Sequence, residues 1–235
     1  MGEGTGGSLR AVPGSPMPPE PWDWPQTQTQ ARPRLWLGPL TPEPAAALSP
    51  QEERWCAALP EALQGRYRGS RSQLRQRLAQ LLARPAAELP LHSPPGQPPS
   101  LGEGLGFVSL SHSREQLLLA WSPWPIGVDL EWASRPLLAE AVARRFFPPE
   151  EWHDLQTLPP EQRQRAVLES WVRKEAAIKW HRGGIAHDLR HWSWHRLSGA
   201  LVHLQHGWCP SSACRLHDGW LCAVVGEAAP LAIWG

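Results

Sequence analysis

The sequence predicts a protein of mixed helices and antiparallel strands. Three short apolar runs, at residues 107–111, 117–121 and 126–132, are separated by turns of only a few residues. Such short turns favour an antiparallel meander. Other segments show apolar residues at helical spacing. From residue 107 onward the predicted order is strands, then helices, then strands again.

Composition narrows the class of protein. With 235 residues and 41% apolar composition, the chain can bury the core of one large or two small domains. The formal net charge of +1 argues against a nucleic-acid partner. No apolar run approaches ~20 residues, and the first residues lack the pattern of a secretory signal. We therefore expect a cytoplasmic protein that does not bind membranes, with its four cysteines as reduced packing thiols.

The first part of the chain changes from a polar tail to helices. Residues 1–45 are rich in Gly, Pro, Ser, Thr and Gln, so we expect a mostly disordered tail, with a short edge strand at 35–40. One helix is predicted within 48–63, capped by Ser49. A second, capped by Ser70, is expected to run to about residue 83.

Four arginines crowd the region of the second helix. Arg71 and Arg75 lie one turn apart and share a face, with Arg66 and Arg68 close by. A solvated basic face and a clamp for a phosphate group both explain this cluster.

The strand 126–132 carries two acids on one face. Period two places Asp129 and Glu131 together, with Val128 and Leu130 on the opposite face. Neighbouring like charges repel and require a cation if the strand is central. Two acids with a third from another element would form an all-oxygen site suited to Mg²⁺.

The helix predicted over 161–180 supplies a third acid. Glu175 interrupts its apolar stripe, one turn after Trp171 and three residues before Ile178. A local ion pair with Lys179 at i+4, or with the adjacent Lys174, is the simpler explanation. The two strand acids make a shared cation site the alternative.

Further elements complete the pattern. A helix is predicted over 134–147 with Ser134 as its cap, and the segments HWSWHRL, ALVHLQ and GWLCAVVGE are expected to form a second sheet. His191 and His195 have the spacing of helical zinc ligands, but alternation with tryptophans indicates a strand, so a zinc pair there is not expected.

Four motifs follow one another in a characteristic order: SLSHS (109–113), GVDLE (127–131), ARRFFPPEEW (143–152) and WVRKEAAIK (171–179). Together they resemble the 4′-phosphopantetheinyl transferase superfamily, Sfp type. Upstream, RYRGSRSQLRQRL resembles the basic helix of that family, so the resemblance covers roughly residues 48–195. A GxDxE strand followed some forty residues later by WxxKExxxK is specific as a pair.

The resemblance implies an α+β fold of two similar halves, 46–124 and 125–235, packed as an intramolecular pseudo-dimer with the active site between them. It implies Mg²⁺-dependent transfer of 4′-phosphopantetheine from coenzyme A to a serine of an apo acyl or peptidyl carrier protein, leaving adenosine 3′,5′-bisphosphate. It also assigns residues by position. The metal ligands would be Asp129, Glu131 and Glu175, with Glu175 as general base; the coenzyme A contacts would be Arg75, Gln97, Ser111, His112, Lys174 and Lys179.

One departure from the family pattern concerns a loop. The family usually has Gly-Lys-Pro before its first strand, whereas Gln97 stands here at the lysine position. A non-catalytic module that binds a carrier protein or an anionic ligand is the main alternative, although the intact acid set speaks against it. We expect a monomer, and the sequence leaves the carrier protein and pathway open.

Overall fold

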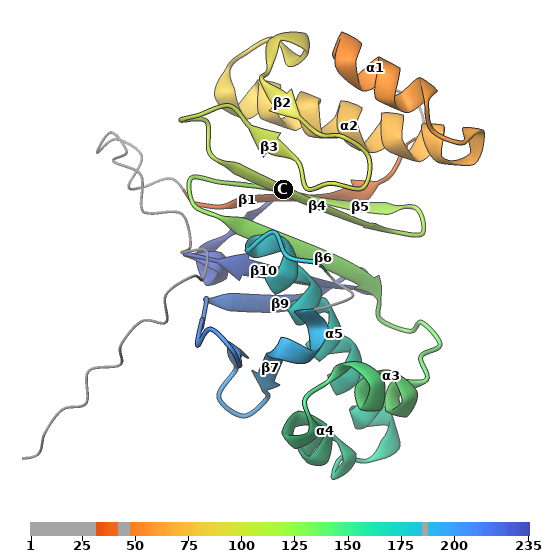
Figure 1. Cartoon of the computed structure of the whole chain (residues 1–235), viewed down its shortest axis with the longest axis vertical. Helices are drawn as coiled ribbons and strands as arrows, with labels where there is room; N and C mark the ends of the chain where they lie inside the picture. Colours follow the sequence, from red (N-terminus) through yellow and green to blue (C-terminus); the bar gives the residue numbers. More distant parts are fainter. Residues whose placement is uncertain (1–31, 42–47, 185–187) are drawn as a thin grey trace, which may run out of the picture.

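A computed structural model describes residues 32–41, 48–184 and 188–235. Two β-sheets pack face to face, and each carries a long helix on its outer side (Figure 1). Three apolar clusters fill the spaces between these four layers. The predicted tail lies largely outside the described residues.

The first sheet contains four strands in the order β11-β1-β5-β4. Strands β4 and β5 form the predicted hairpin, β1 pairs with β5 antiparallel, and the final strand β11 lies parallel to β1. The predicted edge strand near residue 35 is thus an inner strand of this sheet. Its members are β1 (Arg34–Pro39), β4 (Phe107–Ser113), β5 (Gln116–Ser122) and β11 (Ile233–Trp234).

The second sheet has the order β6-β10-β9 and consists of β6 (Ile126–Trp132), β9 (Ser212–His217) and β10 (Trp220–Gly226). The prediction that β6 continues a meander with β5 is wrong, because β6 pairs antiparallel with β10 instead. Its Val128 and Leu130 pack on Leu118 and Ala120 of the first sheet. The two sheets therefore meet through side chains on their inner faces.

The predicted second sheet also divides into two parts. The segments around residues 192 and 200 pair only with each other, whereas the last predicted strand joins β6. The described two-stranded pairs are β2 (Leu91–His92) with β3 (Ser100–Leu101), and β7 (Trp192–His195) with β8 (Ala200–His203).

The helices confirm some predicted starts and correct others. Ser49 caps the first helix through a capping box with Glu52, as its sequence position predicts. Ser70 instead lies inside the second helix, where its hydroxyl donates to the Tyr67 carbonyl, and Ser134 precedes its helix by several residues. The helices are α1 (Pro50–Ala57), α2 (Glu61–Leu82), α3 (Ala139–Phe146), α4 (Pro149–Gln156) and α5 (Pro160–Trp180), with short 3₁₀ turns η2 (Ala86–Glu88), η3 (Leu189–His191) and η4 (Ala229–Leu231).

Helix α5 approaches the second sheet closely at Gly127. A Cβ atom at that position would lie 1.9 Å from the Ala176 carbonyl oxygen and 2.4 Å from the Trp180 backbone nitrogen. Only glycine allows this approach without a shift of the backbone. The glycine of the GVDLE motif thus brings α5 against the strand that carries Asp129 and Glu131.

Arg75 is part of the internal structure of the first half. Its side chain is 1% exposed, and its Nε donates to Glu52 Oε2 at 2.5 Å. The remaining guanidinium nitrogens donate to three carbonyl oxygens, those of Ala86, Leu89 and Leu91. The prediction that Arg75 binds a phosphate is therefore corrected: its donors hold α1, α2 and the following segment together.

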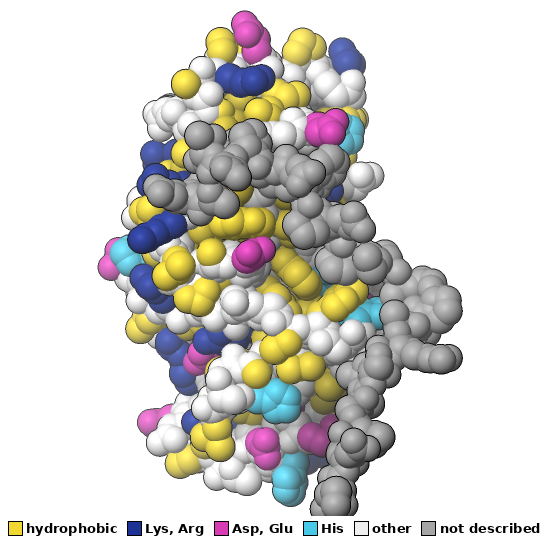
Figure 2. All heavy atoms as spheres, turned by 90° about the vertical axis from the view of Figure 1, so that its left-hand side faces the viewer, with side chains coloured by type: hydrophobic (Ala, Val, Ile, Leu, Met, Phe, Trp, Pro, Cys, Tyr) yellow, Lys and Arg dark blue, Asp and Glu magenta, His cyan; other side chains and the backbone are white. Residues whose placement is uncertain are grey.

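Charged side chains of both signs are visible on the face of the molecule shown in Figure 2. On the face shown in Figure 2, Lys and Arg side chains follow one edge and are interspersed with acidic groups. This pattern agrees with the small net charge of +1 and gives that face no uniform sign. Within the described residues, no helix has the length and apolar character needed to cross a membrane.

Candidate functional site

A cavity of about 700 Å³ lies where β4, β6 and the C-terminal end of α5 meet. The loop of residues 96–99 and the residues that follow α5 complete its wall. Seven of the nine residues predicted for the site line this cavity: Gln97, Ser111, His112, Asp129, Glu131, Glu175 and Lys179.

Asp129 joins three elements through one carboxylate oxygen. Its Oδ1 accepts a hydrogen bond of 2.6 Å from the Ser111 hydroxyl on β4 and another of 2.6 Å from Lys179 Nζ on α5. The residue is only 3% exposed. A buried carboxylate needs such partners, since an unpaired charge in the interior is costly.

The serines of β4 repeat this contact along β6. The Ser109 hydroxyl accepts from the Val128 backbone N–H at 3.1 Å, and the Ser113 hydroxyl donates to Glu131 at 3.0 Å. Glu131 also forms a close ion pair with Arg135. Every second residue of β4 thus faces β6, and two of these serines bind the two acids of β6. This follows from the alternation of side chains between the two faces of a strand.

Glu175 is the least compensated acid of the cavity. Burial, and next the negative charge of Asp129, raise its pKa to about 8; Lys179 opposes this shift. Lys179 therefore serves two carboxylates and pairs directly with Asp129. Glu175 and Lys179, both described, form no ion pair, so the simpler prediction is not met: Lys179 acts on Glu175 through its charge, and its close contact is with Asp129.

Positive groups line the same cavity beside the acids. Arg71, Lys179 and Arg182 contribute to its wall. The pKa of His112 is lowered by burial first and then by the charge of Arg66, with Lys179 and Arg71 acting in the same direction. These cations create a local positive potential, which would attract an anionic group.

Lys174 does not reach the cavity, contrary to the prediction that it contacts a cofactor. It is fully buried outside the cavity lining, where its Nζ lies 2.6 Å from Glu151 and 3.6 Å from the centre of the Phe147 ring. Burial lowers its pKa to about 8, and Glu151 opposes this shift. Glu151 also accepts from Ser170 and from the Trp194 backbone, so this cluster fixes α4 and β7 to α5.

Three further wall residues, Arg71, Arg182 and Trp208, were not among the site residues assigned from the sequence, although a phosphate clamp was one interpretation of the arginine cluster that contains Arg71. Arg71 faces the cavity in place of Arg75, one turn earlier on α2, and the arginine cluster was the available signal. Arg182 adopts a φ of 61° and donates to the Pro99 carbonyl at 3.3 Å, which links the end of α5 to the 96–99 loop. Trp208 also lines the cavity, and nothing in its sequence context indicated this.

The three acids offer the donor chemistry of a hard cation. Asp129, Glu131 and Glu175 present only carboxylate oxygens, the ligands that Mg²⁺ prefers. Among the described residues, the one His, Cys, Asp and Glu group with ligand atoms all within 4.8 Å is a different one, formed by Asp188, His191 and His203.

Part of the chain is similar to known proteins. Residues 125–225 match the model of the 4′-phosphopantetheinyl transferase superfamily. A segment of 84 residues is 42% identical to the 4′-phosphopantetheinyl transferase HetI of Nostoc sp., covering 35% of each chain. Two others are the 4′-phosphopantetheinyl transferase psf-1 of Bacillus pumilus, 36% identical over 34% of each chain, and a 4′-phosphopantetheinyl transferase of Bacillus subtilis, 37% identical over 30% of this chain and 31% of the relative.

These alignments cover about a third of the length of each relative. The family match contains all three acids and Lys179, whereas Arg71, Gln97, Ser111 and His112 lie before it.

Glu175 should limit the stability of the metal-free protein at high pH. Its folded pKa near 8 exceeds its ordinary value of 4.5, so the folded state favours the protonated carboxyl group. The stability that this group contributes is therefore present at acidic pH and is lost as the pH rises through 8. Glu175→Gln cannot ionise. We expect urea unfolding in a chelator at pH 9 to show a gain of about 1–3 kcal/mol that shrinks towards pH 5. A difference independent of pH would contradict the raised pKa.

Proposed function

We propose that this chain, whose residues 125–225 belong to the 4′-phosphopantetheinyl transferase superfamily, transfers 4′-phosphopantetheine from coenzyme A to a serine hydroxyl of an apo acyl or peptidyl carrier protein. The products are the holo carrier protein and adenosine 3′,5′-bisphosphate. The observation that carries this proposal is one cavity in which three carboxylates stand beside cationic side chains. A pyrophosphate substrate with its metal ion needs both kinds of charge.

The acids fit a magnesium ion. Asp129, Glu131 and Glu175 would hold it, and the upward pKa shift that Asp129 imposes on Glu175 indicates negative charge that a cation would relieve. When bound, Mg²⁺ supplies positive charge to the pyrophosphate and orients it for in-line attack.

Side chains of the protein accept the proton and contact the phosphate groups. Glu175 accepts the proton of the carrier serine, directly or through water, as the serine oxygen attacks the β-phosphorus and the bond to adenosine 3′,5′-bisphosphate breaks. A bound cation would keep this carboxyl group ionised, which is the form that can act as a base. Lys179 can turn from Asp129 towards a phosphate oxygen. Arg71, with Ser111 and His112, faces the part of the cavity that suits the phosphorylated adenosine.

The arrangement of layers supports the expected pair of halves, residues 46–124 and 125–235. Helix α2 covers the outer face of the first sheet, α5 covers that of the second, and the sheets pack together between them. Strands β1 and β11 are exceptions, because both belong to the first sheet although they lie outside residues 46–124. A cytoplasmic monomer stays a prediction.

Transfer can be measured directly by mass spectrometry. The protein is incubated with coenzyme A, Mg²⁺ and an apo carrier protein, and the carrier should gain the mass of one phosphopantetheine group. Asp129→Asn should lower the rate at least about hundredfold, because it removes a metal ligand and the partner of Lys179. Glu140→Gln is the matched control, since Glu140 lies in an exposed ion pair with Arg144 and its variant should retain the rate.

An unchanged carrier mass with every carrier class would contradict the proposed transfer. If the carrier nevertheless bound the protein, the non-catalytic binding module would be the better account. Near-normal transfer by Asp129→Asn would show that Asp129 is not required as a metal ligand in the reaction.

Arg71 and Arg75 form a second matched pair of variants. Arg71→Gln should raise KM for coenzyme A about tenfold but leave KM for 3′-dephospho-coenzyme A nearly unchanged, because a charge-assisted bond to the 3′-phosphate is lost. Arg75→Ala should instead lower the free energy of unfolding by about 3–5 kcal/mol, since Glu52 would be left buried without its partner.

Urea unfolding and substrate kinetics separate these two outcomes. A KM effect confined to Arg75→Ala would reverse the assignment of the two arginines, and an equal KM effect on both forms of coenzyme A would remove Arg71 from the 3′-phosphate.

A further inference from the structure

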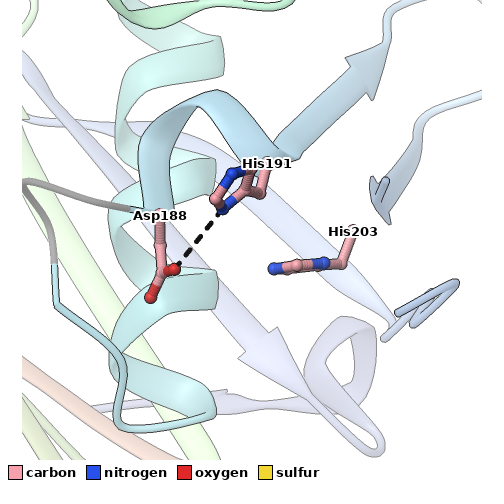
Figure 3. Close-up of side chains that lie close together, drawn as sticks. All are labelled: Asp188, His191 and His203. Atoms are coloured by element: carbon pink, nitrogen blue, oxygen red, sulfur yellow. Dashed lines mark ion pairs between the residues drawn. The ribbon is translucent and has the colours of Figure 1, made fainter. Parts of the chain in front are cut away.

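A second group of potential ligands lies beyond the end of α5. Asp188, His191 and His203 each offer one ligand atom, and these atoms all lie within 4.8 Å of one another. Figure 3 shows the three side chains converging from η3 with its preceding residue and from the end of β8. None of the three lines the cavity described above. His195, the partner that the HxxxH spacing suggested, is exposed and takes no part.

The Asp188 carboxylate is surrounded by nitrogen atoms that it does not bond closely. His191 Nδ1 lies 3.7 Å from Oδ1, and His181 Nε2 lies 3.6 Å from Oδ2. The His181 Nε2 atom is buried without a hydrogen-bond partner. Oδ2 accepts the Gly184 N–H at 3.1 Å, which anchors the acid. The spacing between Asp188 and the two rings is therefore larger than direct hydrogen bonds would give.

His203 presents one nitrogen to this group. The residue is 1% exposed, and its Nδ1 lies 3.2 Å from the His206 backbone N–H, which donates to it. This leaves Nε2 at the ring edge that is directed towards Asp188 in Figure 3. Burial first, then the charges of His206 and His181, lower the pKa of His203 to about 4.

We propose that Asp188, His191 and His203 form a site for Zn²⁺, separate from the acids of the cavity. Two imidazole nitrogens and one carboxylate oxygen suit zinc, whereas Mg²⁺ prefers oxygen ligands alone. Ligand atoms around tetrahedral zinc lie roughly 3.3 Å apart, so small side-chain movements would close the group. Water would take the fourth position.

Neighbouring groups define the strength of this site. Gln205 Nε2 lies 3.1 Å from His191 Nε2 and as placed would donate to it, which puts the ring proton on Nδ1. Binding of zinc through Nδ1 requires the amide to turn, so that its oxygen accepts from the Nε2–H and orients the ring. Binding through His203 Nε2 moves the ring proton to Nδ1 and gives up the bond from the His206 N–H. The site is therefore expected to bind zinc more weakly than one that is fully preformed.

The location gives the zinc a structural role. His181, Arg182, Gly183 and Gly184 line the main cavity, and the Gly184 N–H is bonded to Asp188. A metal that fixes Asp188 would therefore brace the cavity wall just after α5. Zinc binding at these three residues does not require that the chain transfer phosphopantetheine.

Zinc titration of the untagged full-length protein tests the site. Metal is first removed with a chelator, and excess Mg²⁺ is then added to occupy carboxylate-only sites. We expect one Zn²⁺ per chain, and Co²⁺ in its place should show the visible absorption of a four-coordinate site. His191→Gln should weaken zinc binding at least about tenfold, because it removes one nitrogen ligand. His195→Gln, four residues away on an exposed position, should bind as the wild type does.

Thermal melting of the variants separates loss of a ligand from loss of the fold. His191 has a side chain that is 34% exposed, so its variant should melt like the metal-free wild type but gain no stability from added zinc. Absence of stoichiometric zinc in the wild type, or equal affinity in His191→Gln, would overturn the proposal. Loss of zinc in Glu131→Gln would also overturn it by moving the ion to the acidic cavity.

Discussion

The hydrogen bond from Ser111 to Asp129 is the interaction on which the site depends. Strands β4 and β6 belong to different sheets, and no backbone pairing joins them in the described part of the chain. Side-chain bonds from Ser109, Ser111 and Ser113 connect them instead. Lys179 reaches the same Asp129 oxygen from α5. One carboxylate therefore fixes two sheets and a helix around the cavity.

The acid proposed to act in catalysis is also one that destabilises the folded protein. Glu175 remains beside Asp129 with a pKa near 8, so the protein carries an acid that its own lysine only partly compensates. Active sites commonly keep such shifted groups because burial and like charge make them reactive. By contrast, the Arg75–Glu52 and Lys174–Glu151 pairs are fully buried with their partners, and they hold helices in place.

Much of the site could be predicted from local sequence. Side-chain alternation in 126–132 and helical spacing in 161–180 predicted that Asp129, Glu131 and Glu175 lie together, and all three line one cavity. The misassignments of Arg75 and Lys174 came from partners distant in sequence, Glu52 and Glu151, which spacing cannot reveal. The pairing of β6 with β10 was missed for the same reason, because a short turn favours β5 until the inter-sheet core decides otherwise.

The most direct test of the central claim is a crystal structure of the chain with coenzyme A and Mn²⁺, whose anomalous scattering locates the ion. The account predicts that Asp129, Glu131 and Glu175 hold the ion against the pyrophosphate, with Lys179 turned from Asp129 to a phosphate and Arg71 at the 3′-phosphate. An ion bound away from these three carboxylates, or coenzyme A outside the cavity between β4 and α5, would contradict it.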